Sequence, residues 1–217
     1  MYVASHQIKQ MVRKTKEEAQ ATRSALLDAA ELLFHARGVS RTSLNDIAQA
    51  AGMTRGAIYW HFADKADLFN AMLMRVTLPL EETVQSVGDP LNDDPMATIR
   101  RILVNALRVT VTDERARRVF EIATHKVEYV DELLAVRDRH LKVRDECLVH
   151  IENGLKLAAK RGQIQLTVPA RAAAIGLHAL VDGLIQNWIL HPGGFDLLKV
   201  GRQALEVYLG GFEVSGR

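Results

Sequence analysis

Cysteine is almost missing from this sequence, which has Cys147 as its only thiol in 217 residues. One thiol allows neither an internal disulfide nor a cysteine-based zinc site, and it agrees with a reducing compartment. Proline is scarce as well, at five residues, and no convincing run alternates apolar and polar residues between turn signals. The chain also lacks the roughly 18 uninterrupted apolar residues of a bilayer span, and it begins without the apolar core of a signal peptide. These absences predict an all-α protein of the cytoplasm with no membrane partner.

Net charge is small, at +2, but its distribution along the chain is uneven. Residues 1–75 contain ten Lys or Arg against seven Asp or Glu. The positive excess gathers in a basic N-terminal extension over residues 1–15 and around residues 54–65. Charge alone favours a solvated basic tail over a specific anionic partner.

Capping patterns and apolar spacing predict about nine helices in two domains. The helices are expected at residues 16–37, 44–51, 54–61, 65–87, 96–112, 113–127, 130–161, 170–190 and 195–209. The segment VGDPLNDDPM separates the two domains, because it is rich in Gly, Pro, Asn and Asp. We therefore expect a small N-terminal domain over residues 16–64, a connecting helix over 65–87 and a larger helical domain over 95–217.

Two short helices joined by a glycine turn stand out in the N-terminal domain. Ser43 with Asp46 forms one N-cap, Thr54 forms the next, and Gly52 suits a left-handed turn between them. These are the proportions of a helix-turn-helix, whose second helix enters the major groove of DNA. The spacing also assigns a set of apolar side chains to the inward faces: Leu44, Ile47, Ala48, Ile58 and Phe62.

The outward face of the second helix carries polar, aromatic and cationic residues that suit a DNA duplex. Arg55 fits a bidentate contact to guanine, and Gly56 with Ala57 permits a close backbone approach. Hydroxyl, imidazole and ammonium groups nearby fit phosphates. The residues expected to bind DNA are Thr42, Ser43, Thr54, Arg55, Gly56, Ala57, Tyr59, Trp60, His61 and Lys65. For Trp60 the sequence leaves two interpretations open, this outward position and a core position against a neighbouring helix.

The block TSLNDIAQAAGMTRGAIYWHFADKADLF, within residues 16–70, resembles the N-terminal DNA-binding domain of the TetR transcriptional regulators. The segments MVRKTKEEAQATR, ARRVFEIATHKVEY, RGQI and VDGLIQNW resemble the branch that represses multidrug efflux pumps. The resemblance implies a homodimer that binds a palindromic operator. It also implies a C-terminal domain that traps a small hydrophobic ligand and then releases the DNA.

Pairs of residues one helical turn apart are candidate walls for that ligand site. Their positions match those that line the cavity in the efflux-repressor branch, although the spacing alone fits a packed core equally well. The expected ligand-binding residues are Leu103, Leu107, Phe120, Thr124, Cys147, Ile151, His178, Val181, Asp182 and Ile185. Asp182 is the most informative, because a carboxylate on an apolar face is costly to bury without a partner. A ligand's donor or cation is one such partner, and an arginine such as Arg144 or Arg171 is the other.

The residue pattern indicates no catalytic site, cofactor site or metal site. His125, His140, His150 and His178 lack a fixed ligand pair on one helix face, so they are expected on the surface or in the core. Nothing near Cys147 in the sequence lowers its pKa, so packing is expected for it instead of a redox switch. An enzyme should show a nucleophile with its base, a metal set or a phosphate loop, and none is present.

The last two helices have wide apolar faces, which between them predict both the core of the larger domain and a two-fold, four-helix interface of a homodimer. The faces consist of Leu177, Leu180, Leu184 and Trp188, and of Leu197, Val200, Ala204, Leu205 and Tyr208. A dimer has to hold two DNA-reading helices roughly 34 to 36 Å apart, in successive major grooves.

The sequence thus predicts a repressor that binds double-stranded operator DNA and is released by small hydrophobic or cationic effectors. A multidrug efflux operon is the expected target, and control of metabolism or signalling by a metabolite or lipid is the alternative.

Overall fold

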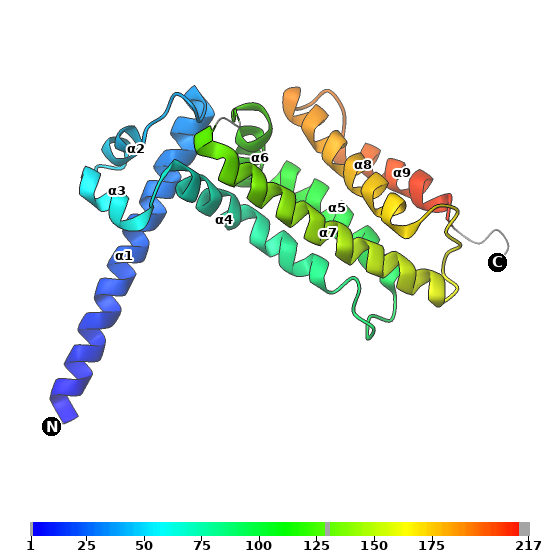
Figure 1. Ribbon diagram of the computed structural model, residues 1–217, viewed down its shortest axis with the longest axis horizontal. Coiled ribbons are helices and arrows are strands. Elements are labelled where there is room, and N and C mark those ends of the chain that lie inside the picture. Colours follow the sequence, from blue (N-terminus) through cyan, green and yellow to red (C-terminus); the bar gives the residue numbers. More distant parts are fainter. Residues whose placement is uncertain (1, 129–130, 213–217) are drawn as a thin grey trace. The chain divides into compact units, whose positions relative to one another are not determined.

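The computed structural model describes residues 2–128 and 131–212. All regular structure in those residues is helical (Figure 1), and the all-α class is confirmed. The α-helices are α1 (Tyr2–Arg37), α2 (Leu44–Ala50), α3 (Arg55–His61), α4 (Lys65–Gln85), α5 (Pro95–Thr112), α6 (Glu114–His125), α7 (Leu134–Lys160), α8 (Ala170–Leu190) and α9 (Leu197–Gly210), and one 3-10 turn, η1 (Asp131–Leu133), precedes α7.

The largest difference from the predicted helix boundaries is at the start of α1. The capping pattern at Thr15 predicts a start there, but α1 is continuous from Tyr2 to Arg37. No glycine or proline interrupts residues 2–37, so nothing in that stretch breaks a helix. The predicted start at Thr15 is wrong, and the basic extension continues directly into the first helix of the N-terminal domain.

The chain forms two compact units, each with its own core. The N-terminal unit contains Met1–Met72 and Lys126–Val136, and the C-terminal unit contains Leu73–His125 and Arg137–Arg217. The N-terminal unit is therefore larger than the expected domain over residues 16–64. It includes the beginning of α4 and the segment that joins α6 to α7.

Helices α1, α2 and α3 pack against one another in the N-terminal unit. The side chains assigned to the inward faces, from Leu44 to Phe62, are all buried. Gly52 has φ 68° at the turn between α2 and α3, a conformation in which glycine has no steric penalty. In the same turn the Met53 amide donates to the Ala48 carbonyl at 2.8 Å. The helix-turn-helix predicted from the sequence is present.

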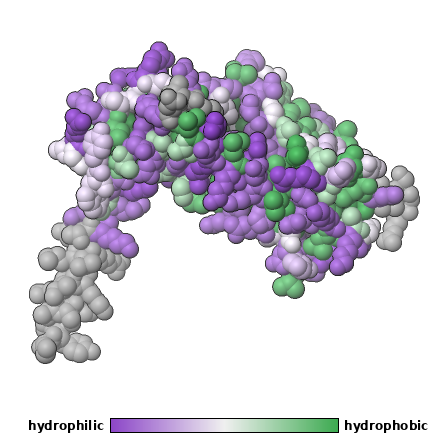
Figure 2. All heavy atoms as spheres, viewed as in Figure 1, coloured by the Kyte–Doolittle hydropathy of each residue, from purple (hydrophilic) through white to green (hydrophobic). Residues whose placement is uncertain are grey.

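Helix α5 is central to the C-terminal unit, where it packs against α6, α8 and α9. The approach of α5 and α9 is close, because a Cβ atom added at Gly201 would lie 2.4 Å from Leu107 Cδ1. The outer surface of the unit keeps some apolar side chains, and Figure 2 shows hydrophobic residues among the hydrophilic ones. The exposed apolar side chains of this unit include Ile175 on α8, 48% exposed, and Val207 on α9, 81% exposed.

Among the described helices, α8 alone is long and apolar enough to cross a membrane by length and composition. The core helices of soluble proteins often have the same length and composition. Ala173, Ala174 and Leu177 of α8 belong to the core of the C-terminal unit. The apolar character of α8 is therefore weak evidence for a membrane span.

Candidate nucleic-acid interface and ligand cavity

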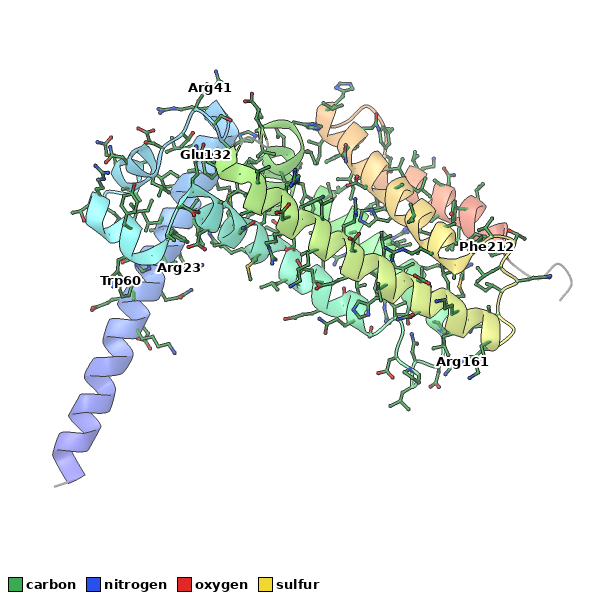
Figure 3. The ribbon with its side chains drawn as sticks, in the orientation of Figure 1. Arg23, Arg41, Trp60, Glu132, Arg161 and Phe212 are labelled. Carbon is green, nitrogen blue, oxygen red and sulfur yellow. The ribbon has the colours of Figure 1, made fainter. Side chains whose placement is uncertain are left out.

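Helix α3 presents one buried and one exposed face. Ile58 faces the core, while Arg55, Gly56 and Tyr59 are exposed. Trp60 is 73% exposed, so the interpretation that placed it in the core is wrong. Figure 3 labels this side chain on the surface of α3, and its ring meets His61 edge to face at 4.6 Å between centroids. Helix α3 therefore has an exposed face of cationic and aromatic groups, as the sequence predicts.

Thr54 is the N-cap residue of α3. The Thr54 hydroxyl oxygen accepts a hydrogen bond from the Ala57 amide at 3.2 Å. A hydroxyl that accepts in this way keeps its own hydrogen as a donor. Thr54 is exposed, so it combines a capping role with a free donor at the start of the exposed face.

Thr42 and Ser43, by contrast, already donate their hydroxyl hydrogens within the protein. Thr42 is 1% exposed, and its hydroxyl donates to the Gly38 carbonyl at 2.9 Å. The Ser43 hydroxyl donates to Asp46 Oδ2 at 2.7 Å, within the capping box of α2. The structure places Thr42 in a buried turn instead of at a surface open to phosphate, and it gives Ser43 a capping role.

Lys65 and His61 differ in their electrostatic surroundings. Lys65 Nζ lies 2.6 Å from Glu132 Oε1, and the Lys65 side chain is only 11% exposed. Burial lowers the pKa of His61, and the nearby charge of Arg23 lowers it further. His61 is therefore a neutral imidazole at neutral pH, while the charge of Lys65 is paired.

A surface hollow of about 550 Å³ lies beside this face. It brings together several of the residues predicted to bind DNA, and it also includes Glu132, which the sequence pattern did not indicate. The hollow is lined by Ser43, Leu44, Asn45, Arg55, Tyr59, Ala63, Asp64, Lys65 and Glu132.

The C-terminal unit contains a cavity of about 240 Å³ with largely apolar walls. Its walls come from α4, α5, α7 and α8. Most of the residues predicted to bind a ligand line it: Leu103, Cys147, Ile151, His178, Val181, Asp182 and Ile185. A concave apolar site with a few polar groups is the usual form of a small-molecule site.

Leu107, Phe120 and Thr124 lie outside this cavity. Leu107 is fully buried, on the side of α5 that faces α9. Phe120, on α6, packs against the hydrophobic core of the C-terminal unit, and Thr124 is exposed with its hydroxyl donating to the Phe120 carbonyl at 2.8 Å. Among the described residues, helix α6 contributes none to the cavity wall, so the predicted ligand contacts on α6 are not brought to it.

Asp182 is the principal acidic group of the cavity on α8. Its Oδ2 accepts a hydrogen bond from Gln186 Nε2 at 2.6 Å. The two arginines considered as its partners pair elsewhere, Arg144 with Asp145 at 2.9 Å and Arg171 with Glu152 at 3.8 Å. Within the described residues, neither arginine neutralises Asp182, which favours the interpretation that its charge faces a ligand.

His178 lies one turn before Asp182 and also lines the cavity. Burial lowers its pKa, and the carboxylate of Asp182 opposes that shift. The charges of His140 and Arg144 lower the pKa of His178 further. His178 is therefore a neutral hydrogen-bonding group at neutral pH, so it brings no positive charge to Asp182.

The comparisons with protein families decide the classification of the chain. Residues 26–72 match the bacterial regulatory proteins of the tetR family. Residues 94–213 match the C-terminal region of the MAATS-type transcriptional repressors. The chain belongs to the TetR family of transcriptional regulators. The resemblance inferred from the sequence is confirmed, and so is the expectation that the protein is a DNA-binding regulator and not an enzyme.

Individual relatives of this TetR-family chain cover nearly its full length. The regulator TtgR of Pseudomonas putida is 42% identical over 188 residues, which are 87% of this chain and 90% of TtgR. The crystal structure of NalD, the secondary repressor of the MexAB-OprM multidrug efflux pump in Pseudomonas aeruginosa, has 35% identity and a TM-score of 0.82, covering 92% of this chain and all of NalD. A complex of SmeT with triclosan has 32% identity and a TM-score of 0.82, covering 90% of this chain and 93% of SmeT; SmeT is the repressor of the SmeDEF multidrug efflux pump of Stenotrophomonas maltophilia.

Several cavity residues of this TetR-family chain were not predicted from the sequence. They lie on α4 (Thr77, Leu80, Glu81, Val84), on α5 (Ile102, Ala106) and on α7 (His140, Val143, Arg144). The sequence pattern predicts a connecting helix for α4, and its apolar stripe includes Leu80. Glu81 follows that stripe directly. A carboxylate beside a long apolar face is the sequence feature that could have indicated a cavity wall on α4.

Proposed function

We propose that this TetR-family chain represses a multidrug efflux operon and leaves its palindromic operator when a small hydrophobic compound fills the cavity. The observation that carries this proposal is the apolar cavity of about 240 Å³ with Asp182 in its wall, in a chain whose helix-turn-helix exposes Arg55 and Tyr59. A DNA-reading face and a ligand site in one chain are the two parts that a ligand-released repressor requires.

The proposed DNA contacts follow from the free groups on α3. Arg55 is exposed and fits a bidentate contact to guanine O6 and N7. Thr54 and Tyr59 offer hydroxyl donors to phosphates, and Trp60 offers an exposed ring to the backbone sugars. Gly56 permits close approach, because its missing side chain leaves room that the protein itself does not fill.

The proposed effector is a small hydrophobic molecule with a cationic or hydrogen-bond-donating group. Apolar side chains dominate the cavity wall, while Asp182 and Glu81 supply negative charge. Among the residues that the structure describes, Glu81 Oε1 is buried without a hydrogen-bond partner, and it forms an ion pair with Arg139 Nη2 at 3.6 Å. A ligand that donates to these carboxylates would gain a charge-assisted bond in a site of low polarity.

The proposed homodimer uses the outer faces of α8 and α9. Leu177, Trp188, Leu197 and Leu205 belong to the core of the C-terminal unit, so they are not available to a partner. Other members of the predicted faces border a surface hollow of about 520 Å³, lined by Ala179, Leu180, Gly183, Leu184, Asn187, Phe195 and Val200. A two-fold contact there would bury exposed apolar surface in both copies. The proposed location of the dimer is the cytoplasm, where operator DNA is accessible.

The test is a gel shift on the DNA upstream of the protein's own gene, with and without triclosan, lipophilic cations and antibiotics. We expect specific retention of the duplex by a dimer and its release by at least one compound of the panel. A scrambled duplex of equal length serves as the control. If the protein retains the specific duplex and none of these compounds releases it, the efflux proposal is contradicted. That result would favour a metabolite or lipid effector.

A further inference from the structure

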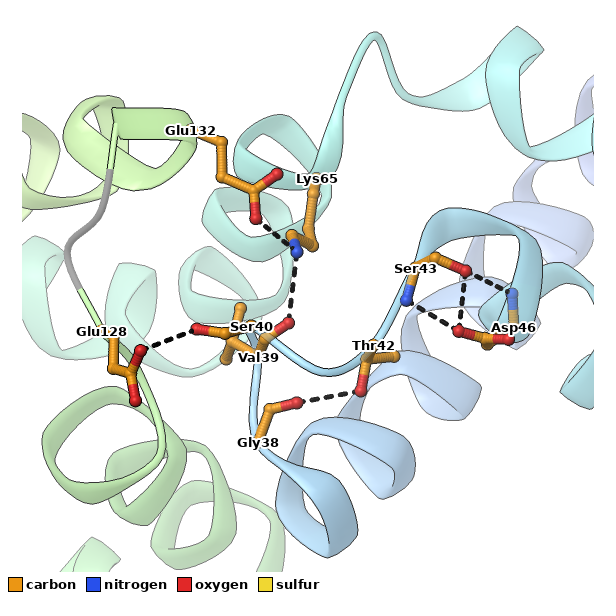
Figure 4. A network of polar contacts seen from close by, with 9 residues as sticks. All are labelled: Gly38, Val39, Ser40, Thr42, Ser43, Asp46, Lys65, Glu128 and Glu132. Atoms are coloured by element: carbon orange, nitrogen blue, oxygen red, sulfur yellow. Dashed lines mark hydrogen bonds and ion pairs between the residues drawn. The ribbon is translucent and has the colours of Figure 1, made fainter.

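Lys65, at the start of α4, is held from two sides by groups far away in the sequence (Figure 4). Its Nζ lies 2.6 Å from Glu132 Oε1 and donates to the Val39 carbonyl at 3.3 Å. An ammonium group has three hydrogens to donate, so these contacts leave one of them for a further acceptor. The charge of Lys65 is therefore engaged by a carboxylate before any DNA arrives.

Glu132 has neighbours in the chain that contact the rest of the N-terminal unit, to which Lys126–Val136 belongs. The Val39 amide donates to the Lys126 carbonyl at 3.0 Å, and the Ser40 hydroxyl donates to Glu128 Oε2 at 3.5 Å. Leu133, next to Glu132, is completely buried. These contacts attach the described residues on either side of Glu132 to the N-terminal unit.

The carboxylate of Glu132 also borders the proposed DNA-binding face. Its side chain is 54% exposed, and it lines the same hollow as Arg55 and Tyr59. Duplex DNA carries a dense line of negative charge, and binding replaces its counterions with protein cations. A carboxylate at this place repels phosphate, and its ion pair with Lys65 opposes the use of that cation to replace a counterion.

We propose that Glu132 competes with the DNA backbone for Lys65 and thereby holds operator affinity below the value that the cations of this face would otherwise reach. The inference rests on the proposed DNA-binding function of the α3 face. Glu132 is thus a positioning residue, which acts on DNA through Lys65 and through its own charge.

The test compares Glu132→Gln with Glu128→Gln in the full-length protein. Both substitutions remove one negative charge from the same segment, but only the first releases Lys65 from an ion pair. Affinity is measured by fluorescence anisotropy over a range of salt concentrations, with an operator candidate and with a random duplex. For Glu132→Gln we expect roughly fivefold to tenfold tighter binding and a log–log salt slope steeper by about 0.9, the value for one additional phosphate contact. For Glu128→Gln we expect a change of about twofold or less, from net charge alone.

A second comparison adds Lys65→Met to both backgrounds. If the two residues act together, Lys65→Met weakens binding more in the Glu132→Gln background than in the wild-type background. Equal losses in the two backgrounds, or equal affinity and slope for Glu132→Gln and wild type, would overturn the inference. Thermal melts of all variants show whether they fold.

The random duplex separates this inference from the proposed function. If the wild-type protein shows no preference for the operator candidate over the random duplex, the repressor proposal fails at that operator. Tighter binding of both duplexes by Glu132→Gln would still support the competition, because phosphate is common to them. Unchanged binding of both duplexes would refute it.

Discussion

The guanidinium carbon of Arg55 lies 5.6 Å from the centroid of the Tyr59 ring, one turn further along α3. A cation at this distance from an aromatic face is attracted to it, and the contact restricts the long Arg55 side chain before DNA binds. Less conformational entropy would then be lost in the proposed contact of Arg55 with a base. Tyr59 thus holds the arginine that we propose as a base-reading group.

This relationship predicts distinct effects for substitutions at the two positions. Arg55→Ala should weaken operator binding by about 1 to 3 kcal/mol, the usual value of a bidentate base contact. Tyr59→Phe keeps the ring and loses only a hydroxyl, so it should cost less than Tyr59→Leu, which loses both. Anisotropy titrations with operator and mismatched duplexes measure the difference. Equal losses for Tyr59→Phe and Tyr59→Leu would show that the ring does not orient Arg55.

Gly56 should show opposite effects on stability and on DNA binding. An added Cβ atom would meet only Thr54 Oγ1, at an ordinary 3.8 Å, so the protein's own packing does not require glycine. Gly56→Ala should therefore raise the free energy of unfolding by about 0.5 to 1 kcal/mol through helix propensity. It should weaken operator binding at least about fivefold if the backbone approaches DNA closely.

Gly52→Ala is the matched control for Gly56→Ala, since Gly52 has φ 68° and alanine is strained there. Urea unfolding should show a loss of stability for Gly52→Ala and a gain for Gly56→Ala. Unchanged operator affinity in Gly56→Ala would mean that DNA does not pack against this position.

Local chemistry made the helix-turn-helix predictable from the sequence. Helices α2 and α3 are capped by Ser43 and Thr54, and the turn between them contains Gly52. The geometry of these caps and of this turn depends only on residues a few positions away in the sequence. Apolar spacing likewise assigned Ile58 and Phe62 to the core, because the period of a helix fixes which residues share a face.

Contacts between distant segments were not predictable in the same way. The spacing of Phe120 and Thr124 on α6 identifies a helix face, but it does not say whether that face meets a cavity, a core or solvent. Lys65 looks like a free cation in the sequence, since its partner Glu132 lies in a segment with no recognisable motif. Such pairings depend on tertiary packing and not on the local pattern.

Asp182 should select cationic ligands within the cavity. Removing its charge with Asp182→Asn preserves the side-chain volume, so apolar contacts with a ligand should persist. We expect the affinity for a lipophilic cation to fall about tenfold, equivalent to roughly 1.4 kcal/mol, and the affinity for a neutral ligand of similar size to change little. Isothermal titration calorimetry with such a matched pair of ligands measures both. An equal change for the two ligands would show that Asp182 does not act through its charge.

Cys147 should behave as a packed thiol and not as a redox sensor. Burial, with a contribution from the charge of Glu81, raises the pKa of Cys147 from 9.0 to about 11. At pH 9 the folded protein should react with iodoacetamide roughly fiftyfold more slowly than a free thiol, because the thiolate is the reactive form. The raised pKa stabilises the folded state below pH 9, and this contribution is lost as the pH rises toward 11.

Alkylation followed by mass spectrometry measures the rate at Cys147, and unfolded protein provides the reference. Cys147→Ser should remove the reaction and leave operator binding unchanged. A mild peroxide treatment that abolishes operator binding in the wild type but not in Cys147→Ser would contradict the packing role.

Gly183 offers a test of the proposed dimer that spares the fold. It lines the hollow on α8, and an added Cβ atom meets nothing within 4 Å in the protomer. Gly183→Arg should therefore fold, yet place a bulky charge where the partner's helices would pack. Val149→Arg is the control, because Val149 is 46% exposed on α7 and does not line this hollow. Sedimentation velocity should show monomers for Gly183→Arg and dimers for Val149→Arg. Operator affinity should fall sharply in Gly183→Arg alone, since one protomer reaches only one half-site. If Gly183→Arg still forms dimers, the dimer interface lies elsewhere.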